Sequence, residues 1–337
     1  MSDLKWQPDI LGPGYDQHVF QLGADPDGEG AIAAVLVRRS PRPGEVTRGA
    51  VLYVHGFTDY FFQTELADFF AARGLRFYAL DLRKCGRARR AGNTAHYVSD
   101  LSRYDEELDQ ALAVLTEENP GLPVLAVAHS TGGLIVPLWL HRRRTAGVSM
   151  TRPVVGAVLN SPWLDLQVSW IVRGPLTQLV RLRAKTRPLA PIKVRPGVYG
   201  QTLHVSGTGE WEYDTDLKPL SGFPATMGWM AAVRHGHAHV HRGIETGVPV
   251  LVLRSDKSLT AAEYSPACDR CDLVLNTKQI GRWARSLGSQ VTDTVVADAR
   301  HDVFLSVPEA RQRAYAALGT WLDRVLPAEQ KRAAAPD

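Results

Sequence analysis

The chain has 337 residues, of which 45% are hydrophobic and 22% charged, a composition typical of a globular protein with one large core or two smaller ones. Three cysteines are too few for a disulfide framework, no apolar run approaches the length of a membrane span, and the first residues lack a secretory signal pattern, so we expect a reduced, cytoplasmic protein. The formal net charge of +4 is too small to indicate a nucleic-acid-binding protein.

Short apolar strands alternate with helical patterns along most of the chain. The predicted strands are 15–22, 31–37, 50–54, 76–80, 124–128, 154–159, 249–254 and 290–296. The predicted helices are 65–73, 101–118, 134–140, 278–287 with Asn276 as its N-cap, and 311–325. This alternation predicts an α/β fold with a mostly parallel, doubly wound sheet, in which reactive groups gather at the carboxyl ends of the strands.

The alternation stops between Trp163 and about Gly243, where strand character is weak and tryptophan, proline and basic residues are frequent. We interpret this stretch as a cap inserted into the sheet domain. The predicted organisation is therefore a first core part at 1–162, the cap at 163–243, a second core part at 244–328 and a frayed tail at 329–337.

The stretch from Pro123 to Gly133, PVLAVAHSTGG, reads as a buried strand that turns sharply into a helix. Such a turn lifts the hydroxyl of Ser130 above the sheet edge, and it needs small residues two positions before and after the serine. Ala128 and Gly132 meet this requirement, with alanine in place of the usual glycine. The pattern predicts a nucleophile elbow centred on Ser130.

Two further strand ends carry residues that would serve a nucleophilic serine. His301 lies just after the last predicted strand, and histidine is the side chain best suited to take a proton from a serine hydroxyl near neutral pH. His55, Gly56 and Phe57 follow the strand 50–54. The backbone N–H groups of Phe57 and Thr131 are the expected donors to an oxyanion.

Together, the HGF at 55–57, the DLRKCGRA at 81–88, the AHSTGG at 128–133 and His301 resemble the serine hydrolases of the alpha/beta-hydrolase fold. The resemblance is to the branch of the monoacylglycerol lipases, lysophospholipases and serine aminopeptidase-like proteins. It implies a catalytic triad in the order serine, acid, histidine, and a variable helical cap. It also places His55, Gly56, His129 and Trp163 around the substrate.

The same resemblance places the triad acid in the loop after the strand 249–254. Asp272 is the first choice, because Asp272 and Asn276 repeat the spacing that precedes the next helix in this branch, and Asp256 is the alternative. Asp269 lies in the same loop, and Asp165 would suit relatives that carry the acid after the preceding strand. The acid would hold the tautomer of His301.

The function implied by this resemblance is hydrolysis of a small-molecule carboxylic ester through an acyl-enzyme, with a glyceride-like or lysophospholipid-like substrate and with neither cofactor nor metal. An acyltransferase or thioesterase with the same Ser-His-Asp triad is the first alternative. A catalytically inactive binding protein of the same fold is the second. The sequence does not indicate the oligomeric state.

Three other features point to possible additional roles. Cys268 and Cys271 form a C-x-x-C pair beside Asp272, which alone is weak evidence for metal or redox chemistry. The four histidines between His235 and His241 have helical metal-ligand spacing but lack a carboxylate motif. The basic residues of the cap would suit transient contact with an anionic lipid surface; they are Arg173, Arg181, Arg183, Lys185 and Arg187.

Overall fold

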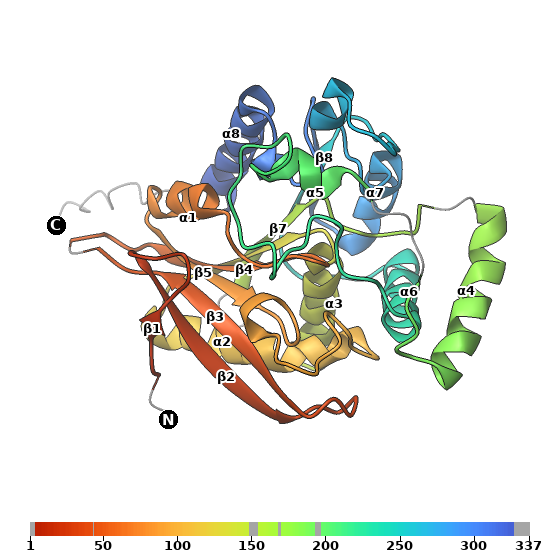
Figure 1. The fold of residues 1–337 in the computed structure, drawn as a ribbon. Helices are drawn as coiled ribbons and strands as arrows, with labels where there is room; N and C mark the ends of the chain where they lie inside the picture. The colour runs from red at the N-terminus through yellow and green to blue at the C-terminus, as the bar shows by residue number, and fades with distance from the viewer. Residues whose placement is uncertain (1–3, 43, 148–153, 168–169, 193–196, 327–337) are drawn as a thin grey trace.

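The computed structural model describes residues 4–42, 44–147, 154–167, 170–192 and 197–326, with the backbone alone at 170–173, 175 and 176. Within these residues the chain forms one nine-stranded sheet in the order β1-β2-β3-β5-β4-β6-β7-β8-β9 (Figure 1). The strands are β1 (Gln7–Pro8), β2 (Tyr15–Ala24), β3 (Ala31–Arg39), β4 (Gly49–Val54), β5 (Leu75–Asp81), β6 (Val124–His129), β7 (Val154–Asn160), β8 (Val250–Ser255) and β9 (Val291–Val296).

The sheet has an antiparallel edge and a parallel body. β1, β2, β3 and β5 pair antiparallel, whereas every pairing from β5 through β4 to β9 is parallel. Parallel strands must be joined by crossovers, and these place helices on both faces of the sheet. The carboxyl ends of β4, β6, β7, β8 and β9 consequently meet at one edge, where the polar residues of the sequence motifs collect.

Helices cover both faces of this sheet (Figure 1). The core on one face is built with α2 (Asp105–Glu118), α3 (Gly132–Thr145) and α7 (Thr277–Ala284). The core on the other face is built with α1 (Thr64–Ala71) and α8 (Pro308–Val325). Short 3₁₀ helices lie between these elements at η1 (Gly86–Ala88), η2 (Leu101–Tyr104), η3 (Pro266–Arg270), η4 (Arg285–Leu287) and η5 (Val303–Leu305). This arrangement confirms the predicted α/β class with a doubly wound sheet.

The element boundaries follow the hydrophobic patterns to within a few residues, with three differences. β1 was not predicted, because two exposed residues carry no pattern. The helix expected at 101–118 begins as the 3₁₀ turn η2, whose cap is Asp100 accepting a hydrogen bond from the Ser102 N–H, and then continues as α2. The helix expected at 278–287 ends at Ala284 and tightens into η4, while Asn276 is its N-cap as predicted.

The described part of the segment between β7 and β8 consists of helices joined by irregular stretches. It contains α4 (Trp170–Thr186), α5 (Tyr199–Leu203) and α6 (Met227–His241). α4 packs against α6 at the outer side of the molecule, and α6 packs on α3 (Figure 1). Gly236 permits that close approach, since a Cβ there would lie 2.9 Å from Leu101 and 3.1 Å from Leu138. The tail 329–337 lies outside the described residues. No described helix combines the length and apolarity needed to cross a bilayer.

Candidate active site

The turn between β6 and α3 holds Ser130 in a backbone conformation that non-glycine residues rarely adopt, with φ at 52°. Such a residue costs about 1–3 kcal/mol unless its surroundings enforce it. Here the Ser130 N–H donates to the Asn160 carbonyl (2.9 Å), and the Ser130 carbonyl accepts from the Trp163 N–H (2.9 Å). A Cβ at Gly132 would lie 2.5 Å from the carbonyl oxygen of His55, so only glycine fits there. The turn therefore has the geometry of a nucleophile elbow.

A continuous chain of hydrogen bonds leads from Ser130 to a buried carboxylate. The Ser130 Oγ donates to Nε2 of His301 (2.9 Å), and Nδ1–H of His301 donates to Oδ2 of Asp272 (3.0 Å). The other carboxylate oxygen of Asp272 accepts the N–H groups of Val274 (2.8 Å) and Leu275 (2.7 Å). Asp272 is fully buried, so both of its oxygens are fixed by protein donors. Three strand ends thus bring together a hydroxyl, an imidazole and a carboxylate.

The other aspartates weighed as the acid lie elsewhere. Asp256 is exposed; its Oδ1 accepts the N–H of Asp298 (2.9 Å), and it makes no contact with His301. Asp269 pairs with Arg300 (2.8 Å). Asp165 accepts the indole N–H of Trp283 (3.0 Å) on the cap side. Of these four aspartates, the structure brings only Asp272 to the ring of His301.

Two backbone N–H groups near Ser130 are available to an anionic oxygen. Within the described part of the chain, neither the N–H of Phe57 nor that of Thr131 donates a hydrogen bond. Gly56 lets the first of them approach, because a Cβ at Gly56 would lie 2.9 Å from the Cβ of Ser130. Free donors beside a reactive hydroxyl can stabilise charge that develops on a bound carbonyl.

A buried ion pair joins the segment between β7 and β8 to the loop that follows Phe57. This pair was not predicted from the sequence. Lys218 Nζ lies 2.6 Å from Oδ1 of Asp59, and Oδ2 of Asp59 accepts from Nδ1 of His129 (3.1 Å). The His129 ring lies 4.9 Å from that of His301. Burial favours the neutral form of Asp59, but the Lys218 ammonium and the His129 hydrogen bond outweigh it and hold the pKa of Asp59 below its usual range.

We expect Lys218→Met to lower the free energy of unfolding by about 3–5 kcal/mol, because the Asp59 carboxylate would stay buried without its main counter-charge. The pKa of Asp59 is depressed in the folded protein, so the ion pair stabilises the fold above pH of about 4 and less as pH falls through the folded pKa. Urea unfolding at pH 7 and pH 3 checks this. Lys218→Met/Asp59→Asn should recover part of the loss, and equal stability of wild type and Lys218→Met would contradict the assignment.

The remaining residues expected around the substrate differ in their availability. His55 uses both ring nitrogens within the protein, since Nδ1–H donates to the Gly56 carbonyl (2.7 Å) and Nε2 accepts from the Leu82 N–H (3.1 Å). The Nε2 of His129 and the indole N–H of Trp163 are buried with no hydrogen-bond partner among the described residues. Trp163 packs 5.7 Å from Trp229 of α6.

Aromatic rings from the sheet domain and from α6 meet close to Phe57. The rings of Phe57 and Trp229 stack 4.0 Å apart, and the Phe57 ring lies 5.0 Å from that of His96. Trp229 is only 2% exposed. Because ligand pockets for apolar groups are lined mostly by hydrophobic and aromatic side chains, these rings suit an apolar part of a substrate.

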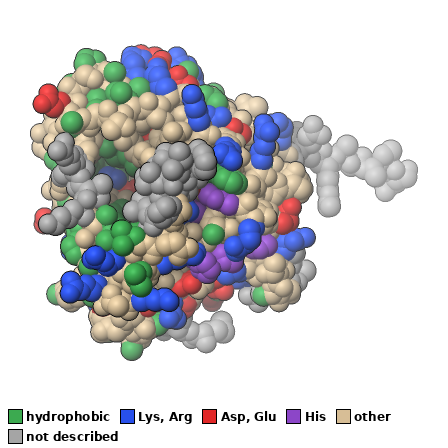
Figure 2. Space-filling model, turned by 90° about the vertical axis from the view of Figure 1, so that its right-hand side faces the viewer, with side chains coloured by type: hydrophobic (Ala, Val, Ile, Leu, Met, Phe, Trp, Pro, Cys, Tyr) green, Lys and Arg blue, Asp and Glu red, His purple; other side chains and the backbone are tan. Residues whose placement is uncertain are grey.

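The cysteine and histidine features remain separate from this site. Cys268 and Cys271 are buried free thiols, and burial raises the pKa of the Cys271 thiol. His235 and His239 share the outer side of α6, with their Nε2 atoms 3.2 Å apart. Figure 2 shows histidine side chains gathered on one face of the molecule beside Lys and Arg side chains. The described residues contain no group of three or more His, Cys, Asp or Glu side chains placed to hold a metal ion.

Comparisons with known proteins agree with this architecture. The family described as "Serine aminopeptidase, S33" matches residues 45–261, more than half of the chain. A monoacylglycerol lipase of Mycolicibacterium smegmatis is 35% identical over 95 residues, which are 28% of this chain and 33% of that relative. The matched part of the chain therefore spans about a third of the length of that relative.

Two solved structures share the fold over nearly the whole chain. A monoglyceride lipase of Saccharomyces cerevisiae has a TM-score of 0.59 at 16% identity, covering 96% of this chain and 95% of that one. A carboxyl esterase of Bacillus coagulans has a TM-score of 0.62 at 13% identity, covering 93% and 99%. The family match, together with the fold that the sequence motifs predicted, identifies the chain as a member of the serine aminopeptidase (S33) family of alpha/beta hydrolases.

Proposed function

We propose that this protein is a serine hydrolase that cleaves carboxylic esters through an acyl-enzyme intermediate. The observation that carries the proposal is the relay from Asp272 through His301 to Ser130, with two free N–H groups beside the hydroxyl. The family match ends at residue 261, before Asp272 and His301, so the roles of these two residues rest on their geometry.

In this mechanism Ser130 Oγ attacks the ester carbonyl while Nε2 of His301 accepts its proton. The N–H groups of Phe57 and Thr131 stabilise the resulting oxyanion. The protonated His301, held by Asp272, then gives its proton to the leaving alkoxide as the carbon–oxygen bond of the ester breaks. Water activated by His301 attacks the acyl-enzyme in the second half of the reaction, which releases the acid and restores the Ser130 hydroxyl.

The substrate that we propose is a small, lipid-like ester of the monoacylglycerol or lysophospholipid type. The buried aromatic rings of Phe57, Trp163 and Trp229 support an apolar acyl group near Ser130. The M. smegmatis relative is a monoacylglycerol lipase, which agrees with this class although the match covers a third of that protein. No step of this mechanism requires a cofactor.

A series of p-nitrophenyl esters of increasing acyl length tests the proposal. We expect kcat/KM for hydrolysis to rise from the acetate to esters with longer acyl chains. In a separate assay with a monoacylglycerol, we expect release of the fatty acid. Transfer of the acyl group to an added alcohol in preference to water would favour the acyltransferase alternative, and preference for thioesters would favour the thioesterase. Absence of hydrolysis together with absence of covalent labelling by a fluorophosphonate would favour an inactive binding protein.

We also propose that α4 contacts an anionic lipid surface, where such a substrate would be found. Leu182 is 64% exposed and Leu179 is 51% exposed on this helix, and they alternate with cations at Arg181, Arg183 and Lys185. Exposed apolar side chains beside cations are typical of helices that lie in a membrane interface. The side chain of Arg173, also expected there, lies outside the described residues.

Changing Leu182 to Gln should weaken sedimentation with phosphatidylglycerol vesicles by about threefold to tenfold, because the change removes part of the free energy of burying one leucine. Hydrolysis of a soluble p-nitrophenyl ester should stay unchanged. The matched control is Leu189→Gln, which removes a 44% exposed leucine beyond the end of the same helix. Equal binding by wild type and Leu182→Gln would exclude this contact.

A further inference from the structure

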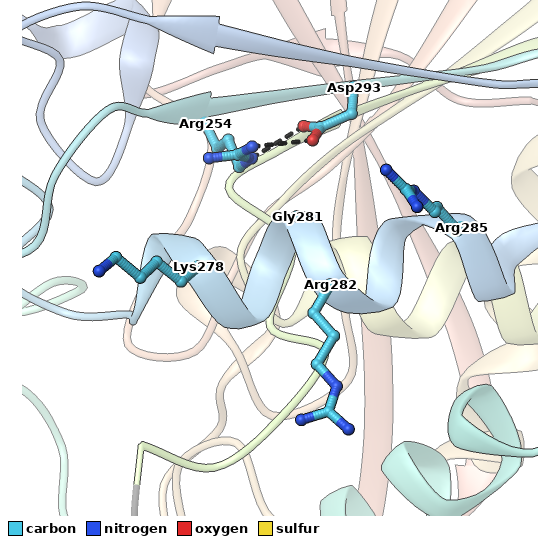
Figure 3. Close-up of a pocket in the computed structure, with 6 residues that line it drawn as sticks. All are labelled: Arg254, Lys278, Gly281, Arg282, Arg285 and Asp293. Atoms are coloured by element: carbon cyan, nitrogen blue, oxygen red, sulfur yellow. Dashed lines mark hydrogen bonds and ion pairs between the residues drawn. The ribbon is translucent and has the colours of Figure 1, made fainter.

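A basic hollow lies on α7, apart from the candidate active site. Its volume is about 450 Å³, and it is lined by Arg254, Lys278, Gly281, Arg282, Arg285 and Asp293 (Figure 3). The lining residues come from β8, β9 and the length of α7, and continue to the first residue of η4. Its size falls in the range of small-molecule sites rather than of protein interfaces.

The charge of this hollow is unbalanced. Both oxygens of Asp293 are occupied by Arg254, whose Nε and Nη2 each donate at 2.8 Å. Lys278 and Arg285 make no side-chain hydrogen bond or ion pair with any described residue. The guanidinium of Arg282 lies 4.9 Å from the centre of the Trp283 ring. The hollow is therefore lined by four cations and one carboxylate, which is paired with Arg254, and the Arg282 side chain points away from that pair (Figure 3).

Helix stability explains Arg282, which lies in the last turn of α7 where the helix dipole favours a cation, but it does not explain Lys278. Lys278 stands in the first turn of α7, where the helix dipole disfavours a positive charge, and it lies four positions before a second cation, Arg282. The opposite side of the helix packs into the core through Ile280 and Ala284. The basic side is thus an exposed stripe whose charges repel one another unless an anion lies between them.

Gly281 lies against the guanidinium of Arg254. A Cβ at this position would lie 2.7 Å from Nη2 of Arg254 and 2.9 Å from its Cζ, so the glycine leaves room for the guanidinium against the helix. Glycine inside a helix costs about 1 kcal/mol relative to alanine. Asp293 holds the Arg254 guanidinium in this place with two hydrogen bonds, which pre-organises it to face a ligand.

We propose that this hollow binds a small ligand through a phosphate group. Arg254, oriented by Asp293, and Arg285 would supply planar guanidinium donors, and Lys278 would supply a point charge at the other end of α7 (Figure 3). Guanidinium and ammonium groups together are the side chains that bind phosphate in proteins. The site does not include Ser130 or His301, so phosphate binding there can be tested independently of the proposed ester hydrolysis.

Isothermal titration calorimetry with inorganic pyrophosphate tests the site. Wild type should bind with one site per chain, and Lys278→Gln/Arg285→Gln should bind at least about tenfold more weakly, since two charge-assisted contacts are lost. Arg181→Gln/Arg183→Gln removes the same charge from α4 and should bind as wild type does. Lys278→Gln/Arg285→Gln should hydrolyse a p-nitrophenyl ester as wild type does, and the circular dichroism spectra of all three proteins should coincide, which shows that they are folded.

Gly281→Ala provides a second variant that acts without a charge change. Its methyl group displaces Arg254 from the helix, so pyrophosphate should bind more weakly, while the helix itself gains stability. Three results would each overturn the proposal. Pyrophosphate binding could weaken as much in Arg181→Gln/Arg183→Gln as in Lys278→Gln/Arg285→Gln, or the latter variant could bind as tightly as wild type. Wild type could also give no more heat with pyrophosphate than with sodium chloride at the same ionic strength.

The source of the phosphate group is distinguished by a lipid arm. In the Arg181→Gln/Arg183→Gln background, vesicles of phosphatidylcholine with phosphatidic acid are compared with soluble glycerol phosphate. Vesicle binding that depends on Lys278 and Arg285, without binding of glycerol phosphate, assigns the site to a lipid headgroup. Binding of glycerol phosphate assigns the site to a soluble ligand. The proposal is overturned if the protein binds neither the vesicles through Lys278 and Arg285, nor glycerol phosphate, nor pyrophosphate.

Discussion

Replacing Ser130 with alanine is expected to lower kcat for p-nitrophenyl ester hydrolysis by about 10⁴- to 10⁶-fold, because no other group can form the acyl-enzyme. The fold should be retained, because the backbone of residue 130 is held by hydrogen bonds to the backbone of Asn160 and Trp163, which alanine can also make. A fluorophosphonate probe should label wild type on Ser130 and leave Ser130→Ala unlabelled. Stopped-flow measurement of a p-nitrophenol burst in wild type checks the covalent intermediate directly.

Ser161 offers a matched control for this experiment. It is a fully buried serine with φ at 45°, it follows β7 at the same edge of the sheet, and its Oγ has no partner among the described residues. It does not contact His301, so Ser161→Ala should keep both labelling and turnover. Normal labelling of Ser130→Ala, or loss of labelling in Ser161→Ala alone, would show that Ser130 is not the nucleophile.

The parts of the site that the sequence predicted are those encoded by local patterns. The elbow around Ser130 depends on a buried strand and small residues within a few positions, and the structure places it as expected. The choice of Asp272 before Asp256 rested on spacing before the next helix, and in the structure Asp272 is the one of the two that lies against His301. Asp272 N–H bonds to the Lys257 carbonyl, so the extra excursion folds back as a closed loop and returns the chain to the sheet edge.

The parts that the sequence could not predict depend on contacts between distant side chains. Lys218 and Asp59 are separated by 159 positions, and neither stands in a motif. Asp302 follows His301 directly, yet its carboxylate accepts from Asn160 Nδ2 (2.6 Å) and does not reach the histidine ring. Tyr199 packs its ring 5.6 Å from that of His301, although it belongs to a cap segment with no periodic pattern. Tertiary packing alone decides such contacts.

The change Asp272→Asn should lower kcat by about 10³- to 10⁴-fold while the fold remains intact, because it should stabilise the wrong tautomer of His301. The two N–H donors of Val274 and Leu275 require an acceptor, so the asparagine carbonyl oxygen would face them and its NH₂ group would face Nδ1 of His301. His301 would then carry its proton on Nε2 and could no longer accept the proton of Ser130. The kcat of a short p-nitrophenyl ester measures the loss, and thermal unfolding checks stability.

Asp256→Asn is the control with the same change of charge and shape in the same loop. Its amide oxygen can still accept the Asp298 N–H, and the side chain has no contact with His301, so kcat should stay within about twofold of wild type, as for most exposed substitutions. Fluorophosphonate labelling should slow in Asp272→Asn and keep its wild-type rate in Asp256→Asn, because labelling also needs proton transfer to His301. A loss confined to Asp256→Asn would move the acid to Asp256 and would require the loop 255–277 to rearrange before catalysis.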